Sequence, residues 1–151
     1  MSSPQDPHNS GHYTQDGTNV YQFEQHLRAI CGWPLREPKL HSPTVMLNLL
    51  GEHIPAIQAW HAGLPAEAHL HWYGKAEVQP RRKMAHLNLC AASLDEALED
   101  FRRVESPLSS QENLHPIKTL TCHANFNGMD EAGFYTDTPN FPVLPHFYSA
   151  Y

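Results

Sequence analysis

One seven-residue stretch, 44–50, limits the possible folds more than any other part of the sequence. In an extended conformation Val45, Leu47 and Leu49 share one face, and the residues between them, on the other face, are also largely apolar. Because both faces need cover, the stretch is predicted to be a buried strand and not the edge of a sheet. We therefore expect an α+β unit in which helices pack on a sheet.

Further strands are predicted from the alternation of apolar and polar residues. Residues 69–73 and 83–90 both place apolar side chains at every second position. A short helical turn is expected at 56–60, and 117–122 has the character of a strand. The unit is thus expected to contain at least three strands before residue 104.

Two helices are indicated by capping boxes and apolar stripes. The first, 19–31, would be capped by Asn19 together with Gln22 three positions later. Its apolar stripe consists of Val20, Phe23, Leu27 and Ile30. The second helix, 93–104, shows the same two signals and is expected to be closed by Pro107.

The two ends of the chain differ from its middle. Residues 1–18 are polar and aperiodic, which is typical of a loop. The last 47 residues hold five of the 13 prolines and show no sustained period of either kind. A boundary is therefore predicted near residue 105, with an irregular tail beyond it.

Charge and composition argue against several classes of protein. The net charge of -6 disfavours general nucleic-acid binding. No segment approaches the roughly 20 apolar residues that cross a membrane, and no apolar run near the N-terminus suggests a signal peptide. Cys31, Cys90 and Cys122 are odd in number and widely spaced, which argues against a disulfide framework. A cytoplasmic location is the expectation.

The 12 histidines raise the question of a metal site. His69 and His71 could share a strand face, and His8 and His12 flank a short glycine-containing loop. No supporting set of ligands stands at the spacing that zinc sites use, so dispersed histidines are the simpler interpretation. A histidine-rich metal-binding protein stays open as an alternative.

Four cations lie close together in and after the polar connection 74–82. They are Lys75, Arg81, Arg82 and Lys83. Such a cluster in an acidic chain could hold a phosphate monoester, although a solvated turn would have the same composition. The residues themselves therefore lead to an α+β domain with a candidate phosphate site, but not to a reaction.

Several segments together resemble the PurK family. They read PHNSGHYT at 7–14, QFEQHLRA at 22–29, VMLNLLG at 45–51 and HLHWYGK at 69–75, followed by Pro80, Arg82, Lys83, Met84 and His86. Their order and gaps also agree with the family, over about 7–103. PurK enzymes are ATP-dependent 5-(carboxyamino)imidazole ribonucleotide synthetases, also called the ATPase subunit of phosphoribosylaminoimidazole carboxylase. They join bicarbonate to aminoimidazole ribonucleotide in purine biosynthesis.

The resemblance implies a fold and a division of the chain. Residues 1–36 would be the remnant of an ATP-grasp domain, comprising its last loop and helix. Residues 37–104 would form the small β-rich C-terminal domain, of the rudiment single hybrid motif type, and 105–151 would be a divergent tail. The fold class implied is α+β.

The resemblance also implies roles for four residues. Lys75 and Arg82 would hold the 5′-phosphate of the ribonucleotide, in agreement with the cation cluster. Asn9 belongs to the loop that shapes the substrate pocket in the family. His8 matches the active-site histidine beside the reacting carboxyl group.

Departures from the family pattern bear on activity. Ser2 stands where the family has the glutamate that binds magnesium–ATP, and Asp6 stands where it has an arginine. An anionic Asp6 would repel bicarbonate or phosphate. Arg81 and Ala85 replace glycines, and Arg81 could crowd a turn that needs a flexible residue.

Everything before the last quarter or third of a family chain has no counterpart in this sequence. No cofactor is therefore expected in this chain, although the family uses ATP and magnesium, and carboxylation by this chain alone is not expected. Binding of aminoimidazole ribonucleotide is expected to be weak at most.

A second hypothesis makes the chain an interaction module. It would form a homodimer or associate with a subunit that supplies the missing lobes. The contact face would then expose apolar residues such as Phe23 or Trp72. No nucleic acid and no membrane are expected as partners.

Overall fold

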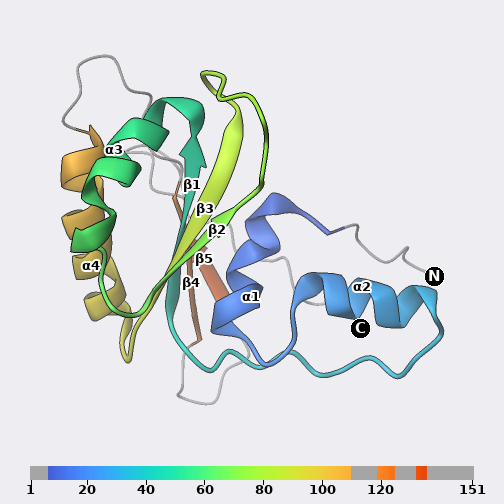
Figure 1. The fold of residues 1–151 in the computed structure, drawn as a ribbon. Coiled ribbons are helices and arrows are strands. Elements are labelled where there is room, and N and C mark those ends of the chain that lie inside the picture. The colour runs from blue at the N-terminus through green and yellow to red at the C-terminus, as the bar shows by residue number, and fades with distance from the viewer. Residues whose placement is uncertain (1–6, 110–118, 125–131, 136–151) are drawn as a thin grey trace.

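A computed structural model describes residues 7–109, 119–124 and 132–135 of the 151-residue chain. Its centre is an antiparallel sheet of five strands in the order β2-β3-β1-β4-β5 (Figure 1). The strands are β1 (Thr44–Leu50), β2 (Ala68–Trp72), β3 (Lys83–Cys90), β4 (Thr119–Ala124) and β5 (Ala132–Tyr135). β1 is therefore an inner strand with a neighbour on each side, as its apolar faces predict.

Helices lie on both sides of this sheet. They are α1 (Thr14–Gly17), α2 (Gln22–Ile30), α3 (Ile54–Trp60) and α4 (Leu94–Ser109), with short 3-10 turns η1 (Asn9–Tyr13), η2 (Gly51–His53) and η3 (His61–Gly63). Figure 1 shows α3 and α4 on one side of the sheet, α1 on the other, and α2 standing beyond α1. In the part of the chain that the structure describes, no helix combines the length and apolar character needed to cross a membrane.

The main core lies between the sheet and the pair α3 and α4. Val45, Leu47 and Leu49 of β1 are fully buried there. The register pairs Leu47 with Leu87 and Val45 with Leu89, so the apolar positions of β1 and β3 face the same side. Met46 points to the opposite side, where it packs against Tyr13 of η1. Both faces of β1 are therefore covered, which confirms the prediction of a buried strand.

The alternation of β3 decides the chemistry of the opposite side. Ala85, Leu87 and Leu89 enter the core, and the positions between them carry His86 and Asn88. This polar row of β3 faces η1 and α1. The fold thereby places a polar layer between the sheet and the first helices.

The helix predicted at 19–31 begins three residues later than its capping pattern indicates. Asn19 does not cap it, because its side chain accepts a hydrogen bond from the Lys39 backbone N–H at 2.7 Å and donates to the Glu37 carbonyl at 3.2 Å. The Gln22 side chain is also engaged elsewhere, at the backbone of His8. Hydrogen bonds to distant parts of the chain thus replace the local capping box.

Residues 9–17 are helical, whereas their composition predicts a loop. His8 begins η1, and its ring accepts a hydrogen bond from the Ser10 backbone N–H at 3.2 Å. This turn and α1 are short and aperiodic, so no stripe of apolar residues could reveal them. Packing against β1 and β3 holds them in place.

The segment after residue 104 is more regular than its composition predicts. Pro107 lies inside α4, which continues to Ser109 because Leu108 is fully buried in the core. Beyond it, β4 covers the free edge of β1 and β5 pairs with β4. The prediction of an irregular tail is wrong for 105–109 and for β5, and the strand predicted at 117–122 overlaps β4 at 119–122.

Candidate functional site

Three imidazole rings form a stack between the sheet and η1, which we call the histidine stack. His12 comes from η1, His71 from β2 and His86 from β3. The His86 ring centroid lies 4.7 Å from that of His12 and 4.6 Å from that of His71, with interplanar angles of 11° and 19°. His71 and His86 meet because the register of β2 and β3 pairs them directly.

Asp16 of α1 holds one end of the histidine stack. Its Oδ2 atom lies 2.7 Å from His71 Nε2 and accepts a hydrogen bond from Asn88 Nδ2 at 2.6 Å. Asn88 also donates to the His12 carbonyl at 3.2 Å. These contacts fasten η1 and α1 to the sheet and fix the position of His71.

Tyr73 connects the histidine stack to the predicted substrate-binding residues. Its hydroxyl lies 3.0 Å from His86 Nδ1 and accepts a long hydrogen bond from Asn9 Nδ2 at 3.5 Å. Lys83 Nζ donates to Asn9 Oδ1 at 2.6 Å, and Lys75 Nζ lies 5.3 Å from the centre of the Tyr73 ring. Two of the predicted residues, Asn9 and Lys75, therefore meet around one tyrosine.

His8 lies at the exposed entrance to η1. Ser10 occupies its Nδ1 atom, through both its backbone N–H and a hydroxyl 2.9 Å away. The Gln22 side chain makes two hydrogen bonds to the His8 backbone: it accepts from the N–H at 3.0 Å and donates to the carbonyl at 2.9 Å. The start of α2 thus sets the position of the loop that carries His8 and Asn9.

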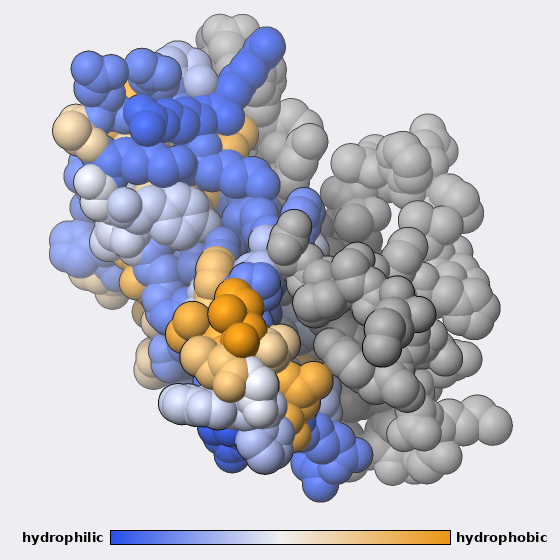
Figure 2. Space-filling view, turned by 90° about the vertical axis from the view of Figure 1, so that its right-hand side faces the viewer, coloured by the Kyte–Doolittle hydropathy of each residue, from blue (hydrophilic) through white to orange (hydrophobic). Residues whose placement is uncertain are grey.

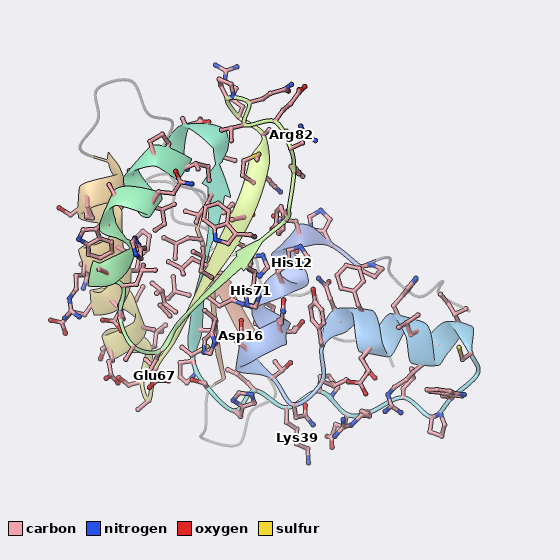
Figure 3. All side chains as sticks on the ribbon, in the orientation of Figure 1. His12, Asp16, Lys39, Glu67, His71 and Arg82 are labelled. Atoms are coloured by element: carbon pink, nitrogen blue, oxygen red, sulfur yellow. The ribbon has the colours of Figure 1, made fainter. Side chains whose placement is uncertain are left out.

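Arg82 does not join this group. It is exposed in the β2–β3 connection, where its guanidinium donates to the Glu77 carbonyl at 3.4 Å. Figure 3 shows it at the far end of that connection, away from His12 and His71. Its neighbour Arg81 has φ +61°, the left-handed conformation that favours glycine, in agreement with the glycine that the family has there.

Burial favours the neutral form of two rings of the histidine stack, His86 and His12. Burial, and next the nearby His12 and His71, lower the pKa of His86 to about 4, while Asp16 acts in the opposite direction. Burial and then the charge of Lys83 lower the pKa of His12. His86 is 2% exposed and its Nε2 atom has no hydrogen-bond partner. Burial without a counter-ion next to the ring explains why the neutral form is favoured.

A shallow pocket of about 400 Å³ opens over these rings. Its lining consists of His12, Gln15, Tyr21, His71, Trp72, Tyr73 and His86. Burial raises the pKa of both Tyr21 and Tyr73, so both hydroxyls stay protonated. The pocket therefore presents flat ring faces and polar tips, with the ammonium of Lys75 beside Tyr73. Such a surface suits a planar polar ring that carries an anionic group.

The described residues gather no set of metal ligands. No cluster of three or more His, Cys, Asp or Glu side chains among them could hold a metal ion. Lys75 is directed at the Lys83 carbonyl, 2.6 Å away, and not at a glycine-rich loop that could cradle a triphosphate. Ser2 and Asp6, which depart from the family pattern, lie outside the described residues.

Comparison with known proteins agrees with the pattern of motifs. Residues 44–100 match the family model for the phosphoribosylaminoimidazole carboxylase C-terminal domain. The N5-carboxyaminoimidazole ribonucleotide synthase of Escherichia coli strain K12 is 52% identical over 82 residues, which cover 54% of this chain and 22% of that protein. The chain resembles the C-terminal part of PurK.

Solved PurK structures share the fold. The ADP complex of purK, an N5-carboxyaminoimidazole ribonucleotide synthetase, has a TM-score of 0.65 and 45% identity, covering 71% of this chain and 28% of that one. The Aspergillus clavatus synthase in complex with ADP and 5-aminoimidazole ribonucleotide has a TM-score of 0.62 and 33% identity, covering 68% and 29%. The chain spans about a fifth to a quarter of the length of the curated PurK relatives it matches.

Sequence reasoning missed the histidine stack. His71 and His86 stand at matching positions of two strands that a single connection joins, so an alignment of these strands as a hairpin could have paired them. His12 gives no comparable signal, because its place depends on how η1 packs on the sheet. The sequence therefore predicts dispersed histidines, whereas three of them form the histidine stack in the structure.

Proposed function

We propose that this chain binds aminoimidazole ribonucleotide as the C-terminal part of a PurK-type ligase does. The observation that carries the proposal is the ring-lined pocket with Lys75 next to Tyr73. A ribonucleotide of this kind combines a flat heteroaromatic ring with a phosphate dianion. The two parts of the pocket match these two parts of the ligand.

The phosphate would bind to Lys75 and Arg82. One of the three N–H groups of Lys75 donates to the Lys83 carbonyl and anchors the ammonium. The other two N–H groups can donate to phosphate oxygens. Arg82 would have to turn from the Glu77 carbonyl toward Lys75 when the ligand binds. Because that hydrogen bond is long and exposed, the rearrangement costs little.

Asn9 and His8 would contact the rest of the ligand. Asn9 is held between Lys83 and Tyr73, so its amide has a defined orientation at the edge of the pocket. Ser10 occupies Nδ1 of His8 and leaves Nε2 on the exposed side of the ring. That nitrogen would lie beside the group that the family carboxylates.

Carboxylation would require more than this chain supplies. The family activates bicarbonate with ATP, and this chain resembles only the C-terminal part of that family. The ring-lined pocket, Lys75 and Asn9 would orient a ribonucleotide, and they do not themselves supply a phosphoryl donor. The role proposed here in purine biosynthesis is therefore substrate binding.

Calorimetric titration with aminoimidazole ribonucleotide tests the proposal. Saturable binding by the wild-type chain should be lost in the double variant Lys75→Ala/Arg82→Ala. The matched control is Lys39→Ala/Arg103→Ala, which removes the same charge from positions where Lys39 pairs with Glu37 and Arg103 with Asp100. The riboside without the phosphate should bind at least roughly tenfold more weakly.

Two results would overturn the proposal. One is the absence of binding at millimolar ligand in a chain whose circular-dichroism spectrum shows it folded. The other is an equal loss of affinity in the control variant, because the phosphate would then respond to net charge and not to a site.

A further inference from the structure

The hydroxyl of Tyr73 belongs to a network whose hydrogen-bond directions follow from its surroundings. It lies 3.0 Å from His86 Nδ1 and 3.5 Å from Asn9 Nδ2. The ammonium of Lys83, 2.6 Å from Asn9 Oδ1, can only donate, so it fixes which end of the Asn9 amide faces it. The NH2 group of Asn9 therefore donates to Tyr73. The direction of the bond between Tyr73 and His86 depends on which ring nitrogen of His86 carries the proton.

Burial decides the position of this proton. His86 is 2% exposed, and its Nε2 atom has no hydrogen-bond partner among the described residues. A proton on Nε2 would leave a buried N–H donor unsatisfied, and the desolvation of that donor would not be repaid. Protein interiors tolerate an unpartnered acceptor more readily than an unpartnered N–H. The proton therefore belongs on Nδ1, where the Tyr73 oxygen accepts it.

We propose that His86 donates its Nδ1 proton to Tyr73, and that Tyr73 in turn donates its own hydroxyl proton to an acceptor atom of the ligand in the pocket. The Tyr73 oxygen then accepts from Asn9 and from His86, and neither of them takes its proton. The inference rests on the proposed function and adds a requirement to it: the ligand presents an acceptor to Tyr73. The imidazole of aminoimidazole ribonucleotide has such an acceptor, its bare ring nitrogen.

The protonation states of both groups agree with this arrangement. Burial, and next the nearby His12 and His71, lower the pKa of His86 to about 4, so the ring carries a single proton at neutral pH. Burial raises the pKa of Tyr73, so its hydroxyl keeps the proton that it would donate. Tyr73 is thus a hydrogen-bond donor in the pocket, and His86 is the residue that positions it.

His12 has the opposite assignment in the same stack. The Oε1 atom of Gln22 accepts from the His8 backbone N–H, so its NH2 group is the one 3.1 Å from His12 Nδ1. Nδ1 of His12 therefore accepts, and this ring carries its proton on Nε2. The Tyr21 hydroxyl lies 3.3 Å from the same nitrogen and can only donate to it. Of the two tyrosines that line the pocket, Tyr73 is the one whose proton is directed to a ligand.

The exposed apolar residues of α2 lie outside the pocket. Phe23, Leu27 and Ile30 are exposed, and Figure 2 shows apolar side chains gathered on the side of the molecule where α2 lies. None of the three lines the pocket. Discrimination between flat ligands therefore depends on hydrogen-bonding groups such as the Tyr73 hydroxyl, because a site built to hydrogen-bond a ligand rejects an analogue without the matching atom.

Long-range proton–nitrogen NMR of the whole chain at pH 7 tests the proton positions, because it distinguishes a ring nitrogen that carries a proton from a bare one. His86 should show a protonated Nδ1 and a bare Nε2, and His12 the reverse. The signals are assigned by their absence from His86→Gln and His12→Gln. A proton on Nε2 of His86 would overturn the proposal, because Tyr73 would then donate its proton to His86 and have none for a ligand.

Calorimetry with aminoimidazole ribonucleotide tests the role in binding. Tyr73→Phe keeps the ring and removes the donor, so it should weaken binding about tenfold. Tyr21→Phe makes the same change at the tyrosine whose proton faces His12, and it should lose clearly less affinity. Equal losses in the two variants would overturn the proposal.

The same titrations separate this inference from the proposed function. If the wild type does not bind the ribonucleotide, the proposed function fails and the role of Tyr73 fails with it. Wild-type binding that Tyr73→Phe leaves unchanged would overturn the role of Tyr73 alone.

Discussion

On acidification, this protein should unfold at a higher pH than its surface histidines alone would cause. The reason is the buried ring of His86. The pKa of this ring is lowered from its ordinary value of 6.5 to about 4 by burial and by the nearby His12 and His71, against the opposing effect of Asp16. Between these two values the unfolded chain takes up a proton that the folded chain does not. Stability is therefore undiminished above pH 6.5 and falls as the pH drops toward 4.

The size of the effect follows from the shift. Each pKa unit corresponds to about 1.4 kcal/mol, so the full loss from His86 is about 3 kcal/mol and the loss at pH 5 is about 2 kcal/mol. His12, whose pKa is also lowered by burial, adds to the loss in the same direction. A loss of this size is a large share of the stability of a small domain.

Urea unfolding at pH 7 and pH 5, followed by circular dichroism, measures this loss. The His86→Gln variant keeps a polar partner for the Tyr73 hydroxyl and removes the titrating ring. The wild type should lose about 2 kcal/mol more than this variant between the two pH values. An exposed-histidine control, His61→Gln, should behave as the wild type does. Equal losses in the wild type and His86→Gln would refute the reasoning, whatever the stability of the variant at pH 7.

Two further predictions concern the backbone. Arg81→Gly should raise the urea midpoint by an amount equivalent to about 1 kcal/mol, because Arg81 has φ +61°, and Arg81→Ala, which keeps a Cβ, should not. No gain from the glycine would mean that the turn is unstrained. Gln22→Ala should lower the stability by about 1–2 kcal/mol, because the backbone N–H and carbonyl of His8 lose their partners. An unchanged midpoint would show that the His8 loop is held without Gln22; exposed Gln58→Ala is the control.

The strands and the family resemblance could be predicted from the sequence because they depend on local patterns. The prediction of 44–50 and 83–90 as strands is confirmed to the residue, and 69–73 differs by one position. The motif at 69–75 likewise indicates Lys75 as a candidate binding residue without any knowledge of the fold. Alternation, apolar content and motif spacing are properties of short segments. The sequence alone therefore contains the information needed to predict these strands and the family resemblance.

The start of α2 could not be predicted in the same way. The capping pattern at Asn19 and Gln22 is sound as local chemistry, yet both side chains bind distant backbone, at Lys39 and at His8. Each of these side chains makes two hydrogen bonds to the distant backbone, one as acceptor and one as donor, where a cap would give it a single bond. The same competition made Pro107 a poor stop for α4, because the buried Leu108 extends the helix.

The sequence by itself determined a buried central strand, two amphipathic helices, a group of cations and a resemblance to the C-terminal part of PurK. Only the tertiary structure decided that His12, His71 and His86 stack, that Lys75 meets Asn9 at Tyr73 while Arg82 stays apart, and that the stripe of α2 faces outward. The physical reason is the same in each case. These features depend on the register of paired strands and on contacts between segments far apart in the chain, which no local pattern encodes.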